Sequence, residues 1–263
     1  MRLYLELARK SFQRQVAYRG ATLAGFVTNL FFGLLRAAIL VAVYGARTEV
    51  AGYSIDDAIT YTGLTQGFIG LTALWGWYDM IRSIRSGEVA SDLSKPFDYY
   101  GFWLAQDVGR GAYQWLARGV TMMIVYALLF DITAPAPAGQ WLGFAISVSL
   151  AWLISFGWRF LVSAAAFWAT DALGFARMAY FFVLFPSGFL IPLAFMPAWL
   201  RTLCYLTPFP SMIDTPVRIY LNQAQGGEVV GLIAVQGAWA LALIVAGRLA
   251  AEAGRRKLTI QGG

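Results

Sequence analysis

Residues 20–45 read GATLAGFVTNLFFGLLRAAILVAVYG, an apolar run in which Arg36 is the only charged side chain. About 20 apolar residues are enough for a helix to cross a bilayer, so this run predicts a membrane-spanning helix. The run is too long for the apolar core of a signal peptide, and we expect it to remain in the protein. The whole chain has the same character, because 59% of its 263 residues are hydrophobic and 13% are charged. Soluble domains carry about 25% charged residues, so the composition indicates a membrane protein.

Five further apolar segments follow the first. We expect membrane-spanning helices at 20–45, 58–80, 111–130, 140–168, 176–193 and 229–250. These runs are continuous, whereas the strands of a β-barrel would give short segments of alternating polarity. The sequence therefore predicts an all-α polytopic membrane protein. We expect a single transmembrane domain over residues 1–263, with its six-helix part at 20–250.

Lysine and arginine residues are distributed unevenly among the segments that connect the predicted spans. With the N-terminus inside, the cytoplasmic segments carry Arg2, Arg9, Lys10, Arg14, Arg19, Arg82, Arg85, Lys95, Arg110, Arg177, Arg248, Arg255, Arg256 and Lys257. The outer segments carry only Arg47, Arg201 and Arg218. Basic residues accumulate on the cytoplasmic side of membrane proteins, so we expect both termini in the cytoplasm. The net charge of +6 has this same origin, and we expect no nucleic-acid partner.

Both ends of the chain carry basic residues beside an apolar span. Residues 1–19 are expected to form an amphipathic helix, because Leu5, Ala8, Phe12 and Val16 recur at helical spacing. Such a helix lies along the lipid headgroups with its basic side facing anionic lipid. The alternative is a helix packed on a protein partner. The basic tail at 251–263 is expected to lie in the cytoplasm.

The stretch from 192 to 227 is largely apolar but rich in proline. Proline removes a backbone donor and disrupts a helix interior. Irregular backbone at membrane depth also needs cover from protein or water. We therefore expect two short helices that enter the outer leaflet as a re-entrant hairpin, and the alternative is an ordinary apolar external loop. The prolines that break this stretch are Pro192, Pro197, Pro208, Pro210 and Pro216.

A polar cytoplasmic segment, residues 81–109, lies between the second and third predicted spans. IRSIRSGEVASDL (81–93) is expected to form one short helix. Pro96 ends it, because the residue before a proline avoids the helical conformation. FDYYGFWLAQDV (97–108) follows as a second amphipathic segment, with aromatic side chains suited to the membrane interface. A rigid helix that joins two spans is a handle for a partner protein, and the alternative is a solvated connector.

Three arginines, Arg36, Arg118 and Arg159, fall within predicted spans. Charges at membrane depth are costly and indicate a cavity, a charged partner or a snorkelling side chain. Arg118 lies near the cytoplasmic end of its span, where Asp79 is a potential partner. Arg36 either faces a substrate path or a second membrane subunit, or snorkels outward. Gly63 and Gly67 form a G-x-x-x-G pattern, which packs helices closely.

Several kinds of chemistry are absent from this sequence. It contains no histidine and one cysteine, Cys204, which excludes a Ser-His mechanism and an internal disulfide. No lysine lies in a glycine-rich phosphate loop, so we expect no ATP site, cofactor or metal in this chain. The acidic residues near the spans fall at or outside span ends, so we expect no carboxylate pair within the bilayer. These residues are Asp79, Asp107, Asp131 and Asp171.

The order of the elements resembles the permease subunit of type-two ABC exporters. IRSGEVASDLSKP (84–96) is similar to the coupling stretch of that family, in which Ile, Gly-Glu, Leu and Pro follow in order. SGFLIPLAFMPAWLRTLCYLTPFPSMIDTPVRIYLNQ (187–223) is similar to the last third of the family. The resemblance covers essentially the whole chain. It implies a coupling helix between the second and third spans that contacts a separate ATPase through Arg85, Gly87, Glu88, Leu93 and Pro96.

The resemblance also implies the partners. They are two copies of an ABC ATPase subunit, which hold ATP and Mg, and a second permease, identical or a different paralogous chain, in a prokaryotic plasma membrane. Arg36, Gly63 and Gly67 become candidates for the translocation path or the permease interface. We expect a transport subunit of an ATP-driven exporter for an amphipathic or lipid-like substrate, without an enzymatic site of its own. The alternatives are a non-transporting membrane scaffold and an intramembrane enzyme.

Overall fold

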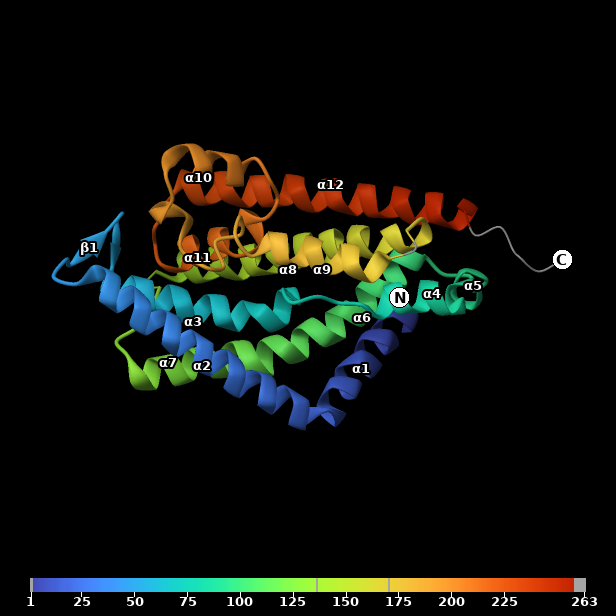
Figure 1. The fold of residues 1–263 in the computed structure, drawn as a ribbon, viewed down its shortest axis with the longest axis horizontal. Helices are drawn as coiled ribbons and strands as arrows, with labels where there is room; N and C mark the ends of the chain where they lie inside the picture. Colours follow the sequence, from blue (N-terminus) through green and yellow to red (C-terminus); the bar gives the residue numbers. More distant parts are fainter. Residues whose placement is uncertain (1, 136, 170, 258–263) are drawn as a thin grey trace.

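The structure is a computed structural model, and it describes residues 2–135, 137–169 and 171–257. The molecule is elongated, and successive helices run back and forth along its long axis (Figure 1). One end carries a small antiparallel hairpin of β1 (Glu49–Val50) and β2 (Tyr53–Ser54) beside the short helix α10 (Ala198–Tyr205). The opposite end carries α4 (Asp79–Ser86), α5 (Glu88–Leu93), the start of α1 (Arg2–Ala17) and the end of α12 (Gly227–Lys257).

The predicted N-terminal helix is present as α1, and α2 (Arg19–Tyr44) follows it directly. α1 packs along α6 (Tyr99–Gln114), where Phe12 meets Tyr113 edge-to-face at 5.5 Å. Gly109 permits this close approach, because a Cβ at that position would collide with the Ala8 backbone. Leu5 and Val16 are exposed, so the apolar residues of α1 are divided between α6 and the surface.

α3 (Ile55–Thr72) is the central helix of the bundle, and every residue from Ala58 to Thr72 is buried. It begins at a capping box, in which the Ser54 hydroxyl and the Asp57 carboxylate satisfy each other's backbone N–H groups. It ends eight residues before the predicted boundary at 80, because Ala73 turns into the left-handed region with φ of +47°. Residues 73–78 form an irregular link to α4.

The third predicted span begins earlier than expected. α6 continues through a π-helical turn (Trp115–Val120) into α7 (Thr121–Leu129), so one helical stretch runs from 99 to 129. It starts at 99 because the Asp98 carboxylate caps it by accepting from the Gly101 N–H at 2.9 Å. Tyr99, Tyr100 and Trp103 are buried inside the bundle, so these three side chains do not contact the membrane interface, whereas Phe97 and Phe102 are half-buried.

The second half of the chain contains α8 (Ala138–Ala164), a 3₁₀ turn (Ala165–Phe167), α9 (Ala172–Val183) and α12. α12 packs along α8. α9 ends ten residues before the predicted boundary at 193, where Pro186 and Gly188, with φ of +82°, interrupt the backbone. α12 continues as a helix through Lys257, so the predicted tail at 251–263 is helical in its first part. Residues 258–263 of that tail lie outside the described residues.

Two short helices, α10 and α11 (Asp214–Tyr220), form within the predicted hairpin at 192–227. Short 3₁₀ turns at Leu193–Phe195 and Pro210–Met212 accompany them. Most of the prolines lie where their missing N–H group costs nothing, since the first N–H groups of a helix have no partner within it. Pro192, Pro197, Pro210 and Pro216 lie at or near such starts, and Pro208 lies in the turn between the two helices.

Three helices among the described residues are long and apolar enough to cross a bilayer: Arg19–Tyr44, Ala138–Phe167 and Gly227–Lys257. α9 is a shorter apolar helix. α3 has 18 residues and α9 has 12, which correspond to about 27 Å and 18 Å at ~1.5 Å per residue. The all-α, polytopic character predicted from the sequence is therefore confirmed in broad terms.

Candidate functional site

The segment predicted to contact a partner protein forms two short helices, α4 and α5, and not the single helix that the sequence predicted. Both helices lie near one end of the molecule (Figure 1). α4 ends and α5 begins at Gly87, which has φ of +81° and terminates α4 in the left-handed region. Glycine adopts this conformation without the cost that a Cβ imposes. A Cβ on Gly87 would have no described neighbour within 4 Å, so the backbone conformation, and not a close contact within the chain, requires glycine here.

This α4–α5 segment (residues 79–98) has an inner and an outer side. Met80, Ile81, Ile84 and Val89 are buried against the bundle. Of the five residues predicted to contact an ATPase, Leu93 is half-buried and packs against the aromatic cluster that includes Trp103. The other four are exposed: Arg85, Gly87, Glu88 and Pro96. Apolar side chains therefore anchor the segment to the bundle, and its outer surface is polar. Leu93 belongs to the anchoring side, because it packs against residues of its own chain.

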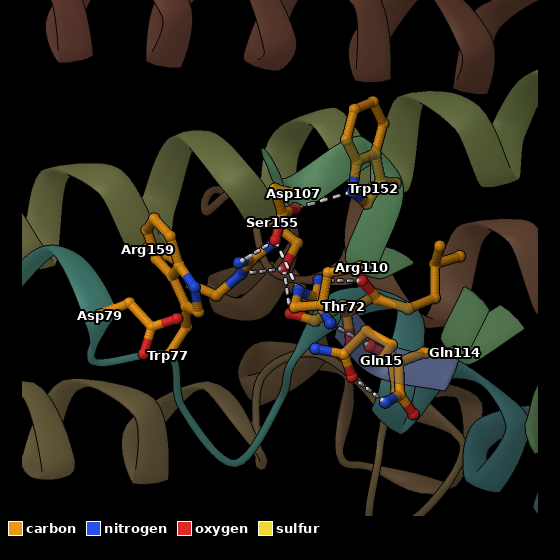
Figure 2. Close-up of polar contacts among 12 residues, drawn as sticks. Gln15, Thr72, Trp77, Asp79, Asp107, Arg110, Gln114, Trp152, Ser155 and Arg159 are labelled. Atoms are coloured by element: carbon orange, nitrogen blue, oxygen red, sulfur yellow. Dashed lines mark hydrogen bonds and ion pairs between the residues drawn. The ribbon is translucent and has the colours of Figure 1, made fainter. Parts of the chain in front are cut away.

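A buried polar cluster lies behind the α4–α5 segment, centred on Asp107 of α6 (Figure 2). The Arg159 guanidinium of α8 donates to both carboxylate oxygens of Asp107, at 3.0 and 2.8 Å. Arg110 Nε donates at 2.6 Å and the Trp152 indole N–H at 2.8 Å. Four donors thus satisfy one carboxylate. Since an unpaired buried charge is costly, this arrangement fixes α6 against α8.

The same cluster holds the end of α3. Arg110 donates to the carbonyl oxygens of Gly70 and Leu71 at 2.6 and 2.9 Å. The Ser155 hydroxyl donates to the Thr72 carbonyl oxygen at 2.6 Å and accepts from Arg159 at 3.3 Å. The last carbonyl groups of a helix have no partner within it. Side chains of α6 and α8 therefore satisfy the carbonyls with which α3 ends.

The link between α3 and α4 is tied to this cluster through Trp77. The Arg159 guanidinium carbon lies 5.7 Å from the centre of the Trp77 ring, a cation–π distance. The Trp77 carbonyl accepts from the Tyr180 hydroxyl of α9 at 3.1 Å, and the Trp77 ring meets Trp103 edge-to-face at 5.2 Å. Residues of α3, α6, α8 and α9 thus meet where the α4–α5 segment is attached.

Residues 30–262 match the family model described as ABC-2 family transporter protein. The chain belongs to the ABC-2 transporter family. An ABC-2 permease is a transmembrane subunit of an ABC transporter, has no ATPase site of its own, and associates with ABC ATPase subunits and the membrane. No curated protein and no solved structure gives a significant match.

Two charged residues of this ABC-2 permease have partners other than those predicted. Asp79 pairs with Arg14 of α1 at 3.2 Å and with Arg82 at 3.7 Å. Arg118 donates to Gln114 at 3.3 Å and lies against Gly25 of α2. The predicted contact between Asp79 and Arg118 is wrong, because α1 lies along α6 and supplies the nearer guanidinium.

The Arg36 guanidinium of the permease has several acceptors within the chain. Its guanidinium donates to the carbonyls of Phe189 and Leu190, the latter at 3.0 Å, and to the Thr65 hydroxyl at 3.3 Å. It also lies 4.8 Å from the centre of the Phe189 ring. Arg36 therefore holds the irregular stretch after α9 against α2 and α3.

Gly63 and Gly67 pack α3 of the permease against its own third helical stretch. A Cβ on Gly63 would lie 2.7 Å from the Tyr126 ring, and one on Gly67 would lie 3.3 Å from the Gly119 backbone. Close helix packing through the G-x-x-x-G pattern is what small residues allow. Both glycines are buried within the chain, so their contacts are internal and do not face outward.

The hairpin region of the permease contains a second buried carboxylate, Asp214 of α11. It accepts from the Tyr205 hydroxyl of α10 at 2.5 Å. Tyr205 in turn accepts from Arg218 at 3.2 Å, and Arg218 pairs with Glu228 of α12 at 2.8 Å. This chain of contacts joins α10, α11 and the start of α12, and it includes Arg218, one of three basic residues that the sequence predicts on the outer side.

Proposed function

We propose that this chain is the membrane-spanning subunit of an ATP-driven exporter for an amphipathic or lipid-like substrate. Two separate ATPase subunits, holding ATP and Mg²⁺, would drive it, and a second permease, identical or paralogous, would complete the path. The observation that carries the proposal is the α4–α5 segment. It presents an exposed polar surface, while its inner side is anchored to the site where four helices converge.

The proposed topology has six crossings, with both termini in the cytoplasm of a prokaryotic cell. Two observations support it. The chain reverses direction along the long axis at the β-hairpin, at α4–α5 and at the hairpin region (Figure 1). The predicted cytoplasmic segments hold most of the basic residues, and the α4–α5 segment lies at the same end as the start of α1 and the end of α12.

The exposed surface of the α4–α5 segment supports its role as the ATPase contact. Arg85 and Glu88 offer charges of opposite sign on either side of Gly87, and no described atom would crowd a partner backbone at Gly87. Closure of the ATPases on ATP would push this segment. The Asp107 cluster would pass the push to α3, α6, α8 and α9 as a unit, because breaking buried ion pairs is costly.

The second permease would cover the outward face of α9. Met178 and Phe181 of α9 are 75% and 74% exposed, and Phe182 beside them is exposed as well. Large apolar side chains in a row mark either lipid contact or a protein interface. Arg36 holds the end of this region to α2, so we place the path along α2 and α9 between the two permeases, with α10 and α11 as a re-entrant cover on the outer side.

The proposal is tested by purifying the tagged chain from its native membrane and measuring how much ATP-binding subunit comes with it. The variant Arg85→Glu with Glu88→Lys keeps the net charge and reverses both exposed charges. We expect it to lose most of the ATPase and to stop ATP-driven export, with normal membrane insertion. The matched control, Glu6→Lys with Arg9→Glu, reverses an exposed pair on α1 and should retain the ATPase.

The purification distinguishes an ATPase contact from the two alternatives, a non-transporting scaffold and a solvated connector. A chain that brings no ATP-binding subunit with it contradicts the proposal and favours a non-transporting scaffold. A reversed variant that keeps its ATPase and exports normally makes the α4–α5 segment a solvated connector.

A further inference from the structure

A polar cavity of about 550 Å³ lies beside the α4–α5 segment. One wall is the connection from Leu93 to Tyr99 that leads into α6, and the opposite wall is the last part of α12, from Arg248 to Arg255. Tyr4 of α1 closes a third side. The cavity therefore lies between the last residues of the α4–α5 segment and the end of α12.

The side chains of the cavity favour an anion. Lys95, Arg248 and Arg255 line it, against the two acidic residues Asp98 and Glu252. Lys95 pairs with the half-buried Asp92 at 2.9 Å. The other two basic side chains form exposed pairs, Arg248 with Asp98 at 3.5 Å and Arg255 with Glu252 at 3.8 Å. Exposed pairs contribute little free energy, so a ligand phosphate could replace these partners at small cost.

Tyr99 carries a buried hydroxyl beside this cavity. It forms part of the cavity wall and is only 6% exposed, and its hydroxyl has no hydrogen-bond partner among the described residues. The neighbouring Trp103 indole N–H is itself a donor, so the hydroxyl proton still lacks an acceptor. Burial raises the pKa of Tyr99, which keeps that proton in place. A buried donor without an acceptor is unfavourable. The hydroxyl is closed off from the cavity in this structure, so a phosphate oxygen would satisfy it only once the Tyr99 side chain turns toward the cavity.

An apolar groove continues from the cavity along α6. It has a volume of about 670 Å³ and shares Tyr4, Asp98 and Arg248 with the cavity. Its other walls are apolar, with Leu5 and Ala8 from α1 and Leu104 and Val108 from α6. Val108 also borders a second apolar groove of about 660 Å³ between α6 and α8. A charged cavity that opens into an apolar groove has the two halves that a lipid molecule needs.

We propose that this cavity and groove bind one anionic phospholipid of the membrane leaflet at this end of the molecule. The phosphate lies among Lys95, Arg248 and Arg255, the Tyr99 side chain turns so that its hydroxyl donates to the phosphate, and an acyl chain follows the groove past Val108. The bound lipid holds the Leu93–Tyr99 connection to α12 and so restrains the α4–α5 segment. Only the assignment to the cytoplasmic leaflet rests on the proposed function, because lipid binding itself needs neither an ATPase nor transport.

The test is native mass spectrometry of the purified full chain in detergent, titrated with dioleoyl phosphatidylglycerol or dioleoyl phosphatidylcholine. The two lipids share their acyl chains and differ in net charge. We expect the anionic lipid to bind on the order of tenfold more tightly, since charge-assisted hydrogen bonds are the strong ones. Arg248→Gln with Arg255→Gln should bring the two affinities together. Arg19→Gln, which removes an exposed charge at the start of α2 and does not line the cavity, should keep the preference.

Two further variants test the hydroxyl and the groove. Tyr99→Phe should leave thermal unfolding in lipid-free detergent unchanged or raised, because the hydroxyl lacks a partner in the described chain, yet it should lower the preference for the anionic lipid severalfold. Val108→Trp should lower the binding affinity for both lipids, because the larger side chain fills the groove. Glycerol 3-phosphate should not displace the lipid at equal concentration.

Three results would overturn the assignment. The first is equal affinity of the wild-type chain for the two lipids. The second is a preference for the anionic lipid that stays undiminished in both the arginine variant and the Tyr99 variant. The third is displacement of the bound lipid by equimolar glycerol 3-phosphate. The last result would mean that the cavity binds a free phosphate ester and not a lipid.

Discussion

Asp107 in α6 and Arg159 in α8 form a two-point ion pair, with Nη–Oδ distances of 3.0 and 2.8 Å, and their side chains are 0% and 2% exposed. Arg110 shares the same carboxylate and also binds the end of α3. One acidic group therefore balances two guanidinium groups at the site where the α4–α5 segment is attached. This arrangement predicts that removing the carboxylate destabilises the folded protein more than removing either arginine.

We expect Asp107→Asn to destabilise the permease by about 3–5 kcal/mol, the range for breaking a buried pair, because it leaves two buried guanidinium groups without a countercharge. Arg159→Met should cost less, since Asp107 still pairs with Arg110. The double variant should be more stable than Asp107→Asn alone. Thermal unfolding in detergent, followed by size-exclusion chromatography, measures this order. Strictly additive losses in the double variant would contradict the shared-carboxylate account.

Gly87 provides a test of backbone conformation. A side chain in the left-handed region costs about 1–2 kcal/mol, and asparagine tolerates it better than branched residues. We expect Gly87→Val to lower the yield of co-purified ATPase by roughly fivefold or more, since it shifts α5 relative to α4. Gly87→Asn should retain most of the ATPase. If both variants lose it equally, open space for the partner matters at Gly87 and the left-handed conformation does not.

Arg36 should control the order of the stretch after α9. Arg36→Leu removes the donors to the Phe189 and Leu190 carbonyls, so amide hydrogen exchange at 184–192 should become at least about tenfold faster. Arg36→Lys should fall between, because an ammonium group lacks the planar fork that reaches several acceptors. The control is Arg118→Leu, because the Arg118 guanidinium donates to Gln114 and not to this stretch, so exchange at 184–192 should stay unchanged. Equal exchange in wild type and Arg36→Leu would contradict the role of Arg36.

The six-span topology predicts which positions an impermeant thiol reagent reaches from outside. Cys204 is buried and is replaced by alanine first. Single cysteines at Ala134 and Gln225, which are exposed, should then react in intact cells, and one at Ser91 of α5 should react only after the membrane is opened. Reaction at Ser91 in intact cells would reverse the orientation and move the proposed ATPase contact to the wrong side of the membrane.

The elements that depend on local sequence could be predicted. The N-terminal helix, the apolar helices α2, α8 and α12, and two short proline-flanked helices at 192–227 were expected from composition, spacing and proline positions. The errors in helix boundaries have both local and tertiary causes. α3 ends early at the left-handed Ala73, where Arg110 and Ser155 satisfy its last carbonyls. α6 starts early at its Asp98 cap, and other helices cover its first aromatic side chains.

The buried cluster could not be predicted because its members lie far apart in the sequence. Asp107 and Arg159 are separated by 52 positions, and nothing local to Asp107 distinguishes a surface carboxylate from a buried one. Arg159 was recognised as a charge within an apolar span, and that charge was the available signal: it requires a partner, and the acidic residues nearest in depth are few. The break at Gly87 was not predicted, because residues 81–93 were expected to form one helix, although glycine favours a helix end.

The central claim, that a separate ATPase contacts this chain through the α4–α5 segment, is tested most directly by a photo-reactive amino acid at Ser91. Ser91 is exposed on α5. The loop between α7 and α8 lies at the opposite end of the molecule (Figure 1), and the exposed Ala134 in that loop serves as the control position. Irradiation of native membranes should join the Ser91 variant, and not the Ala134 variant, to a polypeptide that is itself labelled by a radioactive ATP analogue. Cross-linking of an ATP-binding polypeptide from Ala134 but not from Ser91, or from neither position in membranes that carry out ATP-driven export, would contradict the account.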